Sequence, residues 1–227
     1  MFVGHYGPAF AAKAISKTIP LWLLFIAVQW MDVIWSILVA LGIEKLRIVP
    51  GFTESNPMDL YYMPYTHGLI GALILSVIFG LIAQAALRGT WREIFLVVAC
   101  SVFSHWLLDL VVHVPDLPLI GNSMKVGFGL WRHVRIALPV EIATLVAGAW
   151  IYAHYAPSKT ARGDMWLWAY VVLMSVILIY ATFWGAPTTP MGEARMAILM
   201  YAVFAAIAWL VDRARGTADV KWRTATN

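Results

Sequence analysis

Three ionisable residues, His105, Asp109 and His113, recur at every fourth position in the segment 92–113, which is otherwise almost wholly apolar. A spacing of four repeats nearly every turn of an α-helix, so the three side chains are expected on one helix face. Burying a carboxylate with two imidazoles is costly unless the groups share a partner, and a metal ion is such a partner. The stripe therefore predicts a metal site. A proton relay and a hydrogen-bonded packing device are the alternatives.

Three more polar residues fall at compatible positions in other apolar segments: Asp32 in VQWMDVIW, His67 in MPYTHG and Glu141 in LPVEIA. Mixed histidine and carboxylate ligands suit zinc, iron or manganese better than calcium or magnesium. Zinc, as one ion or two, fits hydrolysis best, because it activates water near neutral pH and a carboxylate such as Asp109 or Glu141 can act as general base.

Each of these residues also has a plainer interpretation. Asp32 alone is typical of a hydrogen-bond partner between helices, and His67 alone could simply open a helix. Glu141 alone could pair with Arg135, about two turns away. The metal hypothesis depends on the number of these residues and their shared depth.

The composition is that of a helical membrane protein. Of 227 residues, 62% are hydrophobic and 12% are charged, and the mean hydropathy is +0.77, whereas soluble domains are about 25% charged. No strand-like alternation suggests a β-barrel. The net charge of +4 indicates topology and contact with anionic membrane lipid, and no nucleic-acid-binding motif is present.

Length and apolarity predict an all-α, polytopic fold of about six membrane spans in a single domain, residues 1–227. The predicted spans are 20–43, 66–87, 92–113, 134–155, 164–184 and 194–212. Residues 1–19 should contain a short amphipathic or re-entrant helix, 20–155 the four-helix core with the metal site, 156–212 two further spans, and 213–227 a polar tail.

The distribution of Lys and Arg predicts the orientation. Ten lie on the side that holds both termini and six on the other, which places both termini in the cytoplasm. The two long connections, 44–65 and 114–133, then emerge together on the opposite, periplasmic face, nearer the His105–His113 stripe, where long ordered loops can cover a site. Within the second loop, Lys125 or Arg132 could neutralise an anionic headgroup. Deep in their spans, Trp30, Trp35 and Trp106 could line a pocket or pack in the core.

Several other chemistries lack their motifs. There is no GxSxG for a serine esterase and no HExxH for a zincin. A transporter or permease that uses the same cluster for an ion or a proton remains an alternative. It is weakened by the lack of an inverted repeat and of buried charge in the last two spans.

The ordered motifs GHYGPAFAAK, QWMD, PYTHG and SHWLLDLVVHVPDLP resemble a family of bacterial membrane-bound metal-dependent hydrolases, over roughly residues 1–150. Their order of His and Asp is also similar to that of zinc-dependent phospholipase C. The resemblance implies a bacterial inner-membrane protein and a ligand set of His5, Asp32, His67, His105, Asp109 and His113, with Glu141 as a further candidate. The phospholipase pattern ends in HxxxE, but Ala137 stands four residues before Glu141, so a third metal is not expected.

The resemblance adds His5, which composition alone does not select. His5 can reach the cluster only if residues 1–19 fold back into the bundle. The functional expectation is a membrane-embedded hydrolase in which metal-activated water attacks an ester or phosphoester of a lipid-like substrate. A purely structural metal is the remaining alternative, and the sequence does not predict the oligomeric state.

Overall fold

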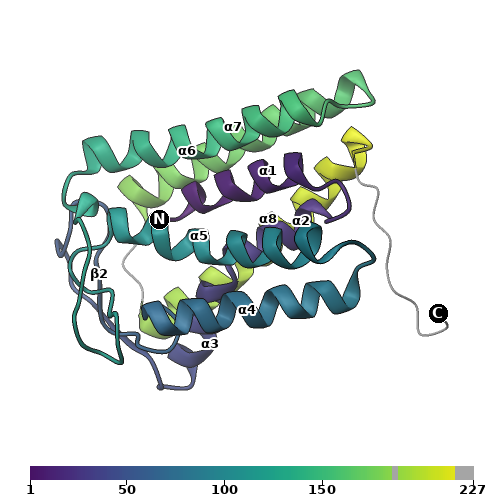
Figure 1. The fold of residues 1–227 in the computed structure, drawn as a ribbon. Helices are drawn as coiled ribbons and strands as arrows, with labels where there is room; N and C mark the ends of the chain where they lie inside the picture. The colour runs from purple at the N-terminus through teal and green to yellow at the C-terminus, as the bar shows by residue number, and fades with distance from the viewer. Residues whose placement is uncertain (186–188, 218–227) are drawn as a thin grey trace.

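The computed structural model describes residues 1–185 and 189–217, and it confirms the all-α class (Figure 1). The helices are α1 (Tyr6–Ile15), α2 (Leu21–Val28), α3 (Trp30–Ala40), α4 (Leu69–Ala86), α5 (Val97–Val112), α6 (Val134–Tyr155), α7 (Ala161–Trp184) and α8 (Pro190–Arg215). The short elements are η1 (Val3–His5), η2 (Arg92–Leu96, a π-helical turn that leads into α5) and η3 (Leu130–Arg132).

Five helical segments are long and apolar enough to cross a membrane, and the bent pair α2 and α3 can form a sixth span. Outward-facing residues of α4 such as Leu73, Ile74 and Ile78 are about half exposed, as expected for a surface in contact with lipid rather than water. The chain is therefore a multi-pass membrane protein, as its composition predicted.

The first predicted span, 20–43, is broken in the middle. The axes of α2 and α3 meet at 54° across Gln29, although no proline or glycine lies nearby to cause the bend. The carbonyl of Val28, the last residue of α2, accepts a hydrogen bond from the ring of His105 at 2.7 Å. A side chain that occupies a backbone carbonyl, in place of the helix's own hydrogen bond, is a recognised cause of sharp bends. The break places Asp32 in the first turn of α3.

Helix α1 folds back into the bundle, as the prediction for His5 requires. It lies alongside α6 and near α5 (Figure 1), and its ten residues span only about 15 Å, too little to cross a bilayer. A Cβ added at Gly148 would lie 2.0 Å from the carbonyl oxygen of Gly7. The two backbones therefore touch, as is common where small residues pack between membrane helices. His5, just before α1, is 1% exposed.

The two long connections lie together at one end of the bundle, as predicted (Figure 1). The N–H of Leu69 donates to Pro118, and the N–H of Ser55 donates to Trp131. The first connection also contains an unpredicted antiparallel hairpin, β1 (Lys45–Ile48) and β2 (Met58–Tyr62), with an irregular register between Lys45 and Arg47. The sequence around this hairpin is polar and rich in turn residues, so its two short strands could not be predicted from a strand pattern.

The prediction that the last two spans carry no buried charge is wrong. Asp212 is 2% exposed and Arg215 is fully buried, because α8 continues to Arg215 and packs against the start of the chain. Asp212 lies 3.3 Å from the ammonium of Lys13, and Arg215 lies over the ring of Tyr152. Residues 218–227 of the predicted polar tail lie outside the described residues.

Candidate metal centre

The predicted ligands converge from separate parts of the fold on two carboxylates, Asp32 and Asp109. His105 Nε2 lies 3.0 Å from Asp109 Oδ2 and 3.5 Å from Asp32 Oδ1. His67 Nε2 lies 3.1 Å from Asp32 Oδ1 and 3.6 Å from Asp109 Oδ2. The break after α2 and the four-residue spacing on α5 together bring these side chains to one point.

The tautomer of His105 follows from its hydrogen bond. Its Nδ1 lies 2.7 Å from the carbonyl oxygen of Val28, and a carbonyl can only accept, so Nδ1 carries a proton. In the neutral ring, Nε2 therefore presents a lone pair toward Asp109 and Asp32. A lone pair that faces two carboxylates is repulsive, so this position calls for a positive charge, either a proton on Nε2 or a metal ion.

His67 is oriented in the same way by a chain of two residues. Glu44, which is 1% exposed, accepts at Oε2 from the Thr66 hydroxyl at 2.6 Å. Thr66 Oγ1 lies 2.8 Å from His67 Nδ1. Because the hydroxyl proton is given to Glu44, the oxygen accepts from His67 Nδ1. His67 Nε2 then faces Asp32 Oδ1 at 3.1 Å, within hydrogen-bond distance.

His113, directly after α5, completes the pattern. Its Nδ1 lies 2.8 Å from Asp116 Oδ1, and its Nε2 lies 3.6 Å from Asp109 Oδ2. An outer oxygen that fixes Nδ1–H while Nε2 points inward is the usual second-shell arrangement of metal-binding histidines. The inward direction of all three Nε2 atoms therefore favours a metal.

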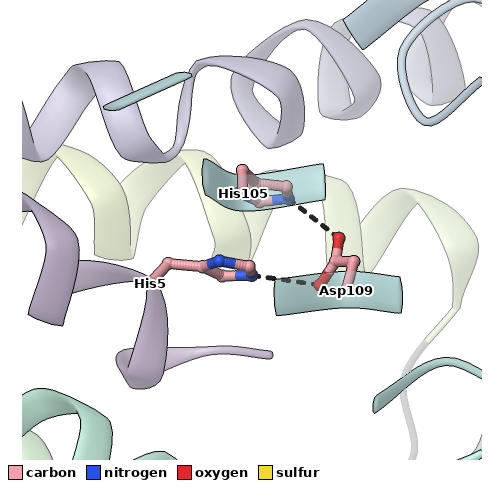
Figure 2. A group of neighbouring side chains, drawn as sticks. All are labelled: His5, His105 and Asp109. Atoms are coloured by element: carbon pink, nitrogen blue, oxygen red, sulfur yellow. Dashed lines mark ion pairs between the residues drawn. The ribbon is translucent and has the colours of Figure 1, made fainter. Parts of the chain in front are cut away.

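His5 enters the cluster from the N-terminal segment (Figure 2). Its ring stacks on that of His105, with centroids 3.8 Å apart and planes 7° from parallel, and its Nε2 lies 3.1 Å from Asp109 Oδ1. The Nε2 atoms of His5 and His105 lie 3.0–3.1 Å from oxygens of Asp109, but neither they nor Nδ1 of His5 form a hydrogen bond of good geometry in the described part of the chain. Buried, unpartnered nitrogens of this kind are what a metal would satisfy.

Within residues 1–185 and 189–217, two sets of three side chains place one ligand atom each within 4.8 Å of one another. One set is His5, His105 and Asp109, and the other is Asp32, His67 and His105. Because His105 belongs to both, the sets form one cluster that can hold one ion or two neighbouring ions. His113 belongs to neither set but lies next to Asp109.

Two further residues contact the cluster although nothing in the sequence predicts their place there. The hydroxyl of Tyr201, on α8, donates to Asp32 Oδ2 at 2.7 Å. The amino group of Met1 lies 2.6 Å from Asp109 Oδ1 inside the bundle. A tyrosine in an apolar span is ordinary, and its contact with Asp32 depends on how α8 crosses α3.

Glu141 reaches the site but makes a different contact from the one predicted. Its Oε2 accepts from the backbone N–H of Phe2 at 2.9 Å and of Gly4 at 3.3 Å, and it belongs to neither ligand set. It does not pair with Arg135 through any contact seen here; it instead holds the turn that carries His5. Glu141 also lines the cavity described next.

The predicted headgroup-binding residues are not brought to the cluster. The ammonium of Lys125 donates to the carbonyl of Tyr61 at 2.7 Å, and Arg132 is exposed in η3. Neither residue is among those that line the cavity in the described structure. The loop that carries them folds over the end of the bundle, so their side chains lie outside its interior.

A cavity of about 810 Å³ adjoins the cluster. Asp32, His67, Asp109, His113 and Glu141 line its polar part, and residues 50, 51 and 53–58 of the first long connection also line it. A ligand in this cavity would therefore contact the candidate metal site directly.

Comparison with protein-family models, curated proteins and solved structures finds no match to this chain. The resemblance to membrane-bound hydrolases thus stays a prediction from the motifs.

Proposed function

We propose that this protein is a membrane-embedded, metal-dependent hydrolase that cleaves an ester or phosphoester of a lipid-like substrate. The observation that carries the proposal is the common orientation of His67, His105 and His113. Each donates Nδ1–H to an outer oxygen and turns Nε2 toward Asp109, and in His67 and His105 also toward Asp32, beside a cavity large enough for a ligand.

The residues that would hold metal are the two sets that share His105, with His113 beside them. Their nitrogen and oxygen donors suit zinc first, with iron or manganese as alternatives. A divalent metal of this kind supplies Lewis acidity and a water nucleophile at neutral pH.

A carboxylate of the chain would act as the general base of the reaction. Asp109 and Glu141 both line the cavity, and either can accept the proton that the attacking water loses. Glu141 has one oxygen, Oε2, engaged by two backbone N–H groups, which fixes the direction of the other. In the proposal the chain lies in a bacterial inner membrane with the cluster in the periplasmic half.

Metal analysis of the purified protein tests the first half of the proposal. We expect a stoichiometric transition metal in the wild type and its loss in His105→Ala and Asp109→Asn. His154→Ala is the matched control, because within the described residues the His154 ring packs on Trp150 and Tyr155 of its own helix and not on the cluster.

Hydrolysis is tested with panels of lipid esters and phosphoesters. We expect turnover that a chelator abolishes and added metal restores. Bound metal without turnover on any substrate would indicate a structural ion and contradict the hydrolase proposal. Proton-coupled ion flux in liposomes without bound metal would contradict it in favour of a transporter.

A further inference from the structure

The cavity beside the cluster is divided by chemistry. One end carries the carboxylates and imidazoles described above, whereas side chains from three helices form an apolar wall. That wall includes Leu138 on α6, Ile177 and Leu178 on α7, and Ala197 and Met200 on α8, and Thr182 and Glu193 are polar residues at the ends of the same helices. All five apolar residues lie within helices that are long and apolar enough to span a membrane.

The volume limits what can occupy this space. Small-molecule sites usually enclose about 300–1,000 Å³, and this cavity of about 810 Å³ lies in that range. An apolar wall that continues into a polar, metal-binding end fits a molecule with one hydrocarbon chain and a compact polar head.

Trp35 provides an independent indication of a ligand. Its side chain lines the cavity beside His67, with ring centroids 6.4 Å apart. The residue is 6% exposed, and its Nε1–H has no acceptor among the described residues. Because buried indole N–H groups normally find a partner, this donor is suited to an oxygen atom of a bound molecule.

We propose that the cavity binds a single-chain amphiphile from the bilayer, with its chain against α6, α7 and α8 and an oxygen of its head accepting from Trp35 Nε1. This inference rests on the proposed function, since it names the substrate class of the same site. It predicts binding of a suitable amphiphile whether or not a bond is cleaved.

The test is equilibrium binding of a radiolabelled long-chain 1-O-alkylglycerol, which has no ester to hydrolyse, to the full chain in diacyl-lipid nanodiscs. Ala197→Phe should weaken binding by about tenfold or more, because the ring fills the apolar end. Ala206→Phe is the matched control on the same helix, since Ala206 is exposed and does not line the cavity. Equal binding by these two variants would overturn the proposal.

A second pair of variants tests the polar contact. Trp35→Phe keeps an aromatic ring beside His67 but removes the donor, and should weaken binding roughly three- to tenfold. Trp30→Phe should leave binding unchanged, because Trp30 also has an unpartnered Nε1 but stacks on Phe79 away from the cavity wall. Equal effects of the two substitutions would refute the role of Trp35.

The binding assay separates this inference from the hydrolase proposal. Selective alkylglycerol binding without turnover would support the amphiphile site and contradict hydrolysis. Chelator-sensitive turnover, with the Ala197 and Ala206 variants binding the probe equally, would support hydrolysis and refute the amphiphile site.

Discussion

Replacing Thr66 by valine removes one hydroxyl and keeps the shape of the side chain. That hydroxyl links Glu44 Oε2, at 2.6 Å, to His67 Nδ1, at 2.8 Å. In Thr66→Val the His67 ring loses the acceptor that fixes its tautomer, while Nε2 of His67 still lies near Asp32. The variant therefore tests whether the orientation of His67 serves metal binding.

The expected effect has two parts. Loss of an outer-shell partner of a metal-binding histidine typically lowers metal affinity by about 10- to 100-fold, or about 1.4–2.7 kcal/mol. In addition, Glu44 loses one of its three hydrogen bonds, since its Oε1 still accepts from Tyr65 and residue 66 N–H groups. A buried oxygen left without its partner lowers the free energy of unfolding by about 1–3 kcal/mol.

The assay is a competitive metal titration against a chelator of known affinity, together with thermal unfolding in detergent. Thr66→Ser should retain nearly the wild-type affinity because it keeps the hydroxyl. Thr144→Val is the matched control, since among the described residues the Thr144 hydroxyl bonds only to Val140 of its own helix. If Thr66→Val unfolds at a lower temperature yet binds metal as tightly as the wild type, the assignment of His67 as a ligand is wrong.

Three further variants address other parts of the structure. Glu141→Gln can still accept the two backbone hydrogen bonds, so metal content should persist. Turnover should fall about 10²- to 10⁴-fold, and undiminished turnover would show that Glu141 is not the base. Gly148→Ala should lower both thermal stability and metal affinity. Its Cβ would meet the Gly7 carbonyl and push α1, with His5, away from α6. Wild-type values for both quantities would contradict this packing. Lys13→Met removes the cation beside the buried Asp212, which keeps hydrogen bonds from Leu21, Tyr152 and Thr217. The loss should destabilise the protein by about 3–5 kcal/mol in thermal or denaturant unfolding, whereas a change below about 1 kcal/mol would show that the pair is replaceable.

Much of this architecture follows from the sequence because local rules determine it. The membrane spans follow from apolar length, and the shared direction of His105 and Asp109 follows from helical spacing alone. Glu44 could not be recognised in the same way. It lies in a loop and acts on His67 through Thr66, a contact that exists only once the first and second spans pack together. Tyr201 likewise meets Asp32 only through the crossing of two distant helices.

The break between α2 and α3 shows why ligand type is easier to predict than ligand orientation. In a continuous helix, the carbonyl of Val28 would accept from the N–H of Asp32. In this structure it accepts instead from His105, which fixes the tautomer that turns Nε2 toward Asp32 and Asp109. One backbone carbonyl thus links the bend in the first span to the cluster. Since no proline or glycine lies at this bend, the His105→Ala variant also tests its cause: if the histidine maintains the bend, its removal should relax the 54° angle as well as release the metal.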